Sequence, residues 1–169
     1  MRPVLFGKPE KLRIPPDEGR FACVGHLADG TQLMAFITGA FPDDYIIDSG
    51  EDGWREIKRW IAVLHLFDAE GNHLSSQSRV GGYDTEGWDE ACEKAHAELQ
   101  LMLAPLRSKA FRSGDIYAKL FTVTLNGVTH GLIYTHHVEL EEDFEGEWVM
   151  FEPRDFMFHP PWDSGEYST

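Results

Sequence analysis

Histidines are the side chains of this sequence best suited to proton transfer or metal binding. His136 and His137 are adjacent, so on a strand they point to opposite faces and do not chelate one metal together. His130 and His136 share a face, and both could cluster with His65 if their strands pair suitably. However, no metal-ligand spacing is present, and imidazole readily packs half-buried on a sheet face. We therefore expect structural histidines and no bound metal or cofactor.

Carboxylates concentrate in residues 43–52 and 139–147. They offer enough oxygen ligands for calcium, but the ligand order of an EF-hand and its central glycine are absent. We interpret both segments as solvated loops.

No motif for nucleophilic catalysis is present in the sequence either. The sequence lacks a G-x-S-x-G elbow. Cys23 lies in an apolar strand pattern and Cys92 on an apolar helix stripe, where the thiol pKa rises and reactivity falls. Gly81-Gly82 lacks the lysine and the strand–loop pattern of a phosphate site. The sequence thus predicts no catalytic residue, and its two cysteines favour reduced thiols in a cytoplasmic protein.

The charge of the chain restricts its partners. A formal net charge of −14 repels phosphate backbones and attracts basic proteins, although acidity also serves solubility. We therefore expect no direct nucleic-acid binding. No apolar run is long enough for a membrane span, so we expect no membrane partner. A protein partner is expected, basic if charge selects it, and a homodimer is left open.

The elements that must position these residues are paired strands and one helix. Apolar patterns and turn residues, Asn126-Gly127 above all, predict three hairpins: residues 21–27 with 32–38, 60–67 with 73–80, and 117–125 with 128–138. Apolar residues at spacings of three and four predict a helix over residues 86–104, whose buried face comprises Trp88, Cys92, Ala95, Leu99 and Met102. The predicted fold class is α+β, an antiparallel, meander-like sheet built from three hairpins with one main amphipathic helix packed on one face.

Residues 1–169 are predicted to form a single domain. Gly81-Gly82 are expected to end the fourth strand. The remaining segments are assigned as an extended N-terminal arm (1–19) with an edge strand at 4–6, an acidic loop (140–147), a short strand (148–151) and a C-terminal tail packed on the body (152–169).

The C-terminal tail contains the best candidate for a recognition aromatic. Trp162 follows Pro160-Pro161, and interfaces favour an aromatic anchor within a polar rim. We predict a partner-binding surface made by the tail and the acidic loop, comprising Trp162, Asp163, Glu166, Tyr167, Glu141, Glu142 and Asp143. The alternative is a structural strap whose aromatics seal the core.

Three stretches show a family resemblance: residues 60–74 (WIAVLHLFDAEGNHL), 121–128 (FTVTLNGV) and 161–167 (PWDSGEY). From about Phe21 onward, the chain resembles bacterial formate hydrogenlyase regulatory proteins of the HycA type. The resemblance implies a non-enzymatic regulator that contacts a transcriptional activator, and it brings no site residue.

These observations predict a non-enzymatic, protein-binding or regulatory domain. Two alternatives stay open. One is an immunity-type protein that neutralises a bacterial toxin, since an acidic domain attracts a basic nuclease. The other is an enzyme whose histidine and carboxylate site is assembled in space.

Overall fold

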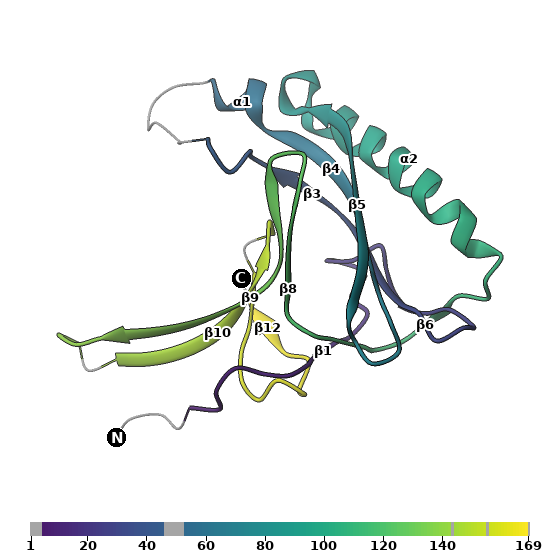
Figure 1. The fold of residues 1–169 in the computed structure, drawn as a ribbon. Coiled ribbons are helices and arrows are strands. Elements are labelled where there is room, and N and C mark those ends of the chain that lie inside the picture. The colour runs from purple at the N-terminus through teal and green to yellow at the C-terminus, as the bar shows by residue number, and fades with distance from the viewer. Residues whose placement is uncertain (1–4, 46–52, 143, 155, 169) are drawn as a thin grey trace.

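The computed structural model describes residues 5–45, 53–142, 144–154 and 156–168, and its fold is α+β with antiparallel sheets, as predicted (Figure 1). The described strands form three sheets, two of five strands and one of two. One main helix, α2 (Trp88–Arg107), accompanies the short helix α1 (Trp54–Ile57) and a 3-10 turn at Asp84–Glu86. No helix in the described ranges is both long and apolar enough to cross a membrane.

The first five-stranded sheet contains two of the predicted hairpins. Its strand order is β5 (His73–Tyr83), β4 (Arg59–Phe67), β3 (Gln32–Ala40), β2 (Cys23–His26) and β6 (Arg112–Ser113). On β4, Ile61 and Val63 face one core cluster, while Ala62 and Leu64 face another. Both faces of this strand are therefore covered, which explains its unbroken apolar run.

Helix α2 covers one face of this sheet (Figure 1). Its buried stripe comprises Ala91, Ala95, Leu99 and Met102. Two residues that were predicted for this buried stripe differ from the prediction. Cys92 is only half-buried. The prediction is wrong for Trp88, which is 61% exposed. Trp88 lies in the first turn of the helix, where it meets the ring of Trp60 edge-on instead of entering the core.

Gly81-Gly82 do not end β5, contrary to the prediction, because the strand continues to Tyr83. A Cβ atom at Gly81 would lie 2.3 Å from the backbone nitrogen of Ala95. These glycines thus allow the helix backbone to approach the sheet closely.

The second five-stranded sheet packs on the other face of the first. Its order is β12 (Tyr167–Ser168), β11 (Phe156–Phe158), β10 (Phe144–Glu152), β9 (Val128–Glu139) and β8 (Phe121–Leu125). Aromatic rings fill the space between the sheets: the centroids of Phe36 and Phe151 are 5.1 Å apart, and those of Phe67 and Phe121 are 5.4 Å apart. The sequence predicted one sheet, whereas the strands divide into separate sheets, and β4 is buried by the second sheet on one face and by α2 on the other.

The N-terminal segment is part of the core and not only an extended arm. β1 (Leu12–Ile14) pairs with β7 (Ile116–Ala118) in the two-stranded sheet, and Leu12 and Ile14 are completely buried. The edge strand predicted at 4–6 is wrong for Leu5 and Phe6, which lie outside any strand, and residue 4 lies outside the described ranges.

The acidic loop predicted at 140–147 is also wrong in extent. β9 continues to Glu139 and β10 already begins at Phe144, so these residues form most of a hairpin. The strand predicted at 148–151 is the second half of β10. The sequence did not indicate this pairing, because the strand residues here are exposed carboxylates and show no alternation of apolar and polar residues.

Candidate functional site

The structure brings three histidines together between the sheets. His65 on β4 lies with its ring centroid 5.8 Å from that of His130 on β9 and 6.3 Å from that of His73 on β5. His65 Nδ1 and His73 Nε2 each lie 2.6 Å from the hydroxyl oxygen of Ser76. A hydroxyl has one proton, so it donates to one ring and accepts an N–H from the other. His136 is not part of this cluster; it lies exposed further along β9.

The surroundings of the cluster are apolar. His65 and His130 are completely buried, and the rings of Phe36 and Phe121 lie 5.7 Å and 5.0 Å from that of His65. Neither nitrogen of His130 has a hydrogen-bond partner within the described ranges. Burial lowers the pKa of His130 to about 4, and burial together with the neighbouring histidines lowers that of His65. The rings are therefore neutral at physiological pH, and a substrate does not reach them.

Metal binding is not supported by this geometry. Among the described residues, no group of three or more histidine, cysteine or carboxylate side chains is arranged to hold a metal ion. Cys23 and Cys92 are both free, and burial raises the pKa of Cys23 to about 11, as the sequence led us to expect.

The hairpin of β9 and β10 is the second notable feature, because it extends beyond its sheet (Figure 1). β8 pairs with β9 only as far as Leu132, and β11 pairs with β10 only from Val149 onward. Within the part of the chain that the structure describes, residues 135–139 and 144–148 therefore pair only with each other. We call this two-stranded part the ribbon. A two-stranded hairpin gains little stability by itself in water.

Glu147 fixes the base of the ribbon. Its carboxylate accepts hydrogen bonds from the backbone N–H of Phe6, from that of Gly7 (3.0 Å) and from the hydroxyl of Tyr134 (2.8 Å). Glu147 is buried, so this carboxylate is not the solvated loop charge that the sequence suggested. It joins the N-terminal segment to both strands of the hairpin.

Beyond this base, the ribbon is exposed. Val138 is 50% exposed and Leu140, at the turn, is 87% exposed. His136 Nε2 lies 2.9 Å from a carboxylate oxygen of Glu145, across the two strands. The predicted site residues Glu141 and Glu142 are exposed beside Leu140, whereas Asp143 lies outside the described residues. The tip thus combines an uncovered leucine with carboxylates.

The predicted tail residues face the fold more than solvent. Trp162 is half-buried, and its indole N–H donates to the carbonyl oxygen of Gly7 (3.0 Å). The Tyr167 hydroxyl donates to Asp17 (2.7 Å), while the Arg20 guanidinium lies 4.8 Å from the ring centroid. Burial and this hydrogen bond raise the pKa of Tyr167.

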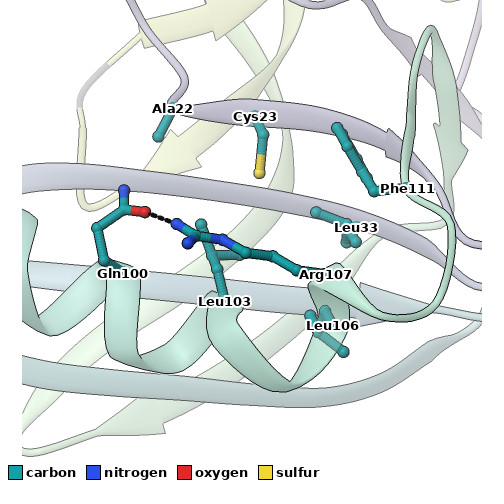
Figure 2. A pocket seen from close by; sticks show the side chains of 8 residues that line it. All are labelled: Ala22, Cys23, Leu33, Gln100, Leu103, Leu106, Arg107 and Phe111. Atoms are coloured by element: carbon teal, nitrogen blue, oxygen red, sulfur yellow. Dashed lines mark hydrogen bonds between the residues drawn. The ribbon is translucent and has the colours of Figure 1, made fainter.

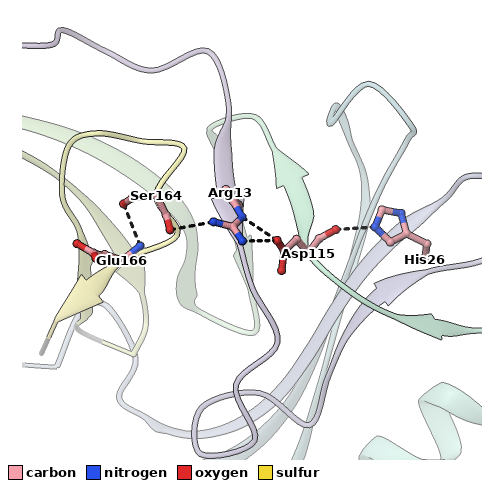
Figure 3. Close-up of polar contacts among 5 residues, drawn as sticks. All are labelled: Arg13, His26, Asp115, Ser164 and Glu166. Carbon is pink, nitrogen blue, oxygen red and sulfur yellow. Dashed lines mark hydrogen bonds and ion pairs between the residues drawn. The ribbon is translucent and has the colours of Figure 1, made fainter.

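Arg13 completes the attachment of the tail (Figure 3). Its guanidinium donates to the carboxylate of Asp115 (2.7 Å) and to the carbonyl oxygen of Ser164 (3.1 Å). The Asp115 carbonyl oxygen in turn lies 2.6 Å from His26 Nε2. Asp163 and Glu166 remain exposed on this tail.

The tail and the ribbon tip do not form one continuous surface. Tyr167 pairs with Phe158, which pairs with Val149, so the tail lies level with position 149 of β10. The ribbon turn lies beyond position 144, about 17 Å further along the strand at ~3.4 Å per residue. The two halves of the predicted site are therefore separate.

The other acidic segment is tied to the start of β9, where this strand pairs with β8. The Asp43 carboxylate accepts hydrogen bonds from the backbone N–H (2.9 Å) and the hydroxyl (2.5 Å) of Thr129. Residues 46–52 lie outside the described ranges.

Sequence reasoning missed His73, Ser76 and the exposed pair Val138 and Leu140. The histidine cluster has no local signal, because its members come from three strands. The ribbon did have one: Val138 and Leu140 are apolar residues inside an acidic stretch.

Comparisons of the chain with protein-family models, with curated proteins and with solved structures found no match. The resemblance to formate hydrogenlyase regulatory proteins therefore stays a prediction.

Proposed function

We propose that this chain is a non-enzymatic protein-binding domain with a regulatory role, and that the ribbon is its recognition element. The observation that supports the proposal most strongly is the 87% exposure of Leu140 at the tip of a hairpin that has left its sheet. Burying a leucine or valine side chain contributes roughly 1.5–3 kcal/mol, so a partner that covers Leu140 and Val138 gains substantial binding energy.

The charges indicate the chemistry of the partner. Glu139, Glu141 and Glu142 surround the tip, and the whole chain has a net charge of −14. A partner with an apolar groove and a basic rim matches this pattern, and long-range attraction accelerates its association. The same charge argues against direct binding to nucleic acid. The free cysteines suit a cytoplasmic location.

An enzymatic function is disfavoured by the histidine cluster. Its two central rings are closed off from solvent, and a general base has to reach the proton that it abstracts. Neutralisation of a basic toxin is the alternative that uses the same ribbon, and the identity of the captured protein separates it from regulation.

Site-specific photo-crosslinking in the native host tests the proposal. A photoreactive amino acid replaces Leu140 in one variant and Leu101 in the other. Leu101 is the matched control because it is also well exposed (61%) but lies on α2. We expect a defined adduct from position 140 only. The purified partner should then bind the Leu140→Ser variant at least ~30-fold more weakly, the effect of losing about 2 kcal/mol.

Two results contradict the proposal: equal capture at both positions, or full affinity of the Leu140→Ser variant for the captured protein. An adduct between two copies of this chain would instead identify the ribbon as a dimer contact.

A further inference from the structure

A pocket of about 240 Å³ lies between the C-terminal half of α2 and the first sheet (Figure 2). No described residue of β9 or β10 lines it, so it is separate from the ribbon. Its walls are mostly apolar: Cys23 and Leu33 come from the sheet, Leu103 and Leu106 from the helix, and Phe111 from the segment after the helix. Most small-molecule sites are concave, largely apolar and provided with a few polar groups at fixed places.

Two polar side chains complete the lining. Arg107 and Gln100 both extend from α2, and the guanidinium donates to the amide oxygen of Gln100 across the side of the pocket (Figure 2). In the described part of the chain, Arg107 contacts no carboxylate, although the protein has 29 acidic and 15 basic residues. A guanidinium next to an apolar pocket, paired only with a neutral amide, is available to an anion.

We propose that this pocket binds a small amphipathic carboxylate, with its apolar part among the leucines and its acid group at Arg107. A guanidinium presents parallel N–H donors that match the two oxygens of a carboxylate. The Gln100 amide offers a further donor at the same edge. With ~30 Å³ per heavy atom, the volume of about 240 Å³ accommodates roughly eight heavy atoms. The ligand is therefore a short-chain or single-ring acid.

Cys23 provides a reporter for occupancy. Its thiol is half-buried in the pocket wall, whereas Cys92 lies on α2 outside the pocket. Both thiols have a raised pKa because of burial, so both react slowly with N-ethylmaleimide at neutral pH. A molecule inside the pocket slows modification of Cys23 and leaves the rate at Cys92 unchanged.

The experiment uses the full chain and hexanoate as the probe, with 1-hexanol and acetate as controls. Calorimetric or NMR titration should give a Kd of roughly 1 mM or below for hexanoate, the range expected for so small a ligand. 1-Hexanol, which lacks the charge, and acetate, which lacks the chain, should each bind at least about tenfold more weakly. Hexanoate should also protect Cys23 from N-ethylmaleimide while Cys92 is modified at the same rate.

Three exposed positions provide variants that do not disturb the core. Arg107→Gln should weaken hexanoate binding about tenfold or more and leave 1-hexanol binding unchanged. Arg112→Gln makes the same charge change on β6, outside the pocket lining, and should have no effect. Ala22→Trp, at an exposed lining position, should abolish Cys23 protection by filling the pocket mouth.

Equal binding of hexanoate and 1-hexanol overturns the proposal, as does saturable hexanoate binding without protection of Cys23. An equal loss of affinity in the Arg107→Gln and Arg112→Gln variants also contradicts it, because the effect would then come from general charge. These outcomes are independent of the ribbon, so they leave the protein-binding proposal untouched.

Discussion

The two ends of strand β9 contain the same residue type in opposite environments. Near its start, the strand pairs with β8, and His130 is completely buried against His65 of the first sheet, without a hydrogen-bond partner for its ring within the described ranges. Near its end, the strand pairs with β10 alone, and His136 lies exposed beside the carboxylate of Glu145. Residue type alone therefore does not determine the environment of a histidine here; the presence or absence of a packed sheet against the strand does.

This contrast separates stability from recognition. The first half of β9 provides part of the aromatic core between the sheets, and substitutions there act on folding. The second half provides little burial, so its apolar side chains are available for binding.

The largest expected effect concerns burial along the strand. Leu132 is 1% exposed, and Leu132→Ala should lower the free energy of unfolding by about 2–5 kcal/mol through the cavity that it leaves. Val138→Ala, on the ribbon, should cost less than about 0.5 kcal/mol. Urea denaturation of both variants measures the difference. Similar losses for the two variants would show that the ribbon is packed as tightly as the core.

The buried histidines should make the protein sensitive to acid. Burial holds the pKa of His65 and His130 below the ordinary value, so the unfolded chain takes up protons first as the pH falls. The stabilisation is therefore complete above about pH 6.5 and is lost as the pH falls toward 4, at up to ~1.4 kcal/mol per pH unit for each histidine.

Unfolding free energies between pH 6.5 and 5 measure this loss, because most carboxylates titrate below that window. His130→Leu should reduce the slope by about one proton. Val138→Ala, on the exposed half of the same strand, removes no titratable group and should leave the slope as it is. An unchanged slope in the His130→Leu variant would mean that other groups cause the acid sensitivity.

Local signals predicted the parts of the fold that depend on near neighbours. The spacing of apolar residues located α2, and Asn126-Gly127 indeed form the hairpin turn, both with positive φ. The unbroken apolar run of β4 indicated that both of its faces are covered. In each case the information lies within one turn or one strand.

The features that sequence reasoning missed depend on distant segments. β1 has only three residues and is stabilised by β7, about a hundred positions away. For the histidine cluster, the sequence allowed a contact between His65 and His130, which the structure contains, but it included His136 and left out His73. The stacking of β4, β5 and β9 decides these contacts, and no local pattern specifies it. Trp88 follows the helical period, but its position in the first turn leaves it exposed. The sequence did not predict the ribbon, because its many carboxylates are typical of a solvated loop.

The tail offers a smaller effect that separates a strap from a recognition anchor. Trp162→Ala removes a half-buried ring and its hydrogen bond to Gly7, and should lower the unfolding free energy by about 2–3 kcal/mol. Trp162→Phe keeps most of the packing and should lose only about 1 kcal/mol, the net value of the hydrogen bond. Thermal denaturation of both variants tests this order. An unchanged melting temperature for Trp162→Ala would instead support the hypothesis that the tail is a recognition anchor and not a structural strap.

The smallest effect on stability should come from the acidic tip of the ribbon. Glu141 and Glu142 are exposed and far from the core, so Glu141→Gln combined with Glu142→Gln should leave the melting temperature unchanged. Their charges act at long range, so the double variant should associate more slowly with the partner captured at position 140, by a few-fold at low salt. The difference should shrink as salt screens the charges. Leu140→Ser, in contrast, removes buried contact area and should mainly accelerate dissociation. Stopped-flow or surface plasmon resonance measurements at several salt concentrations resolve the two rates. If the charge variant instead alters dissociation alone, the carboxylates make direct contacts in the complex and do not steer the encounter.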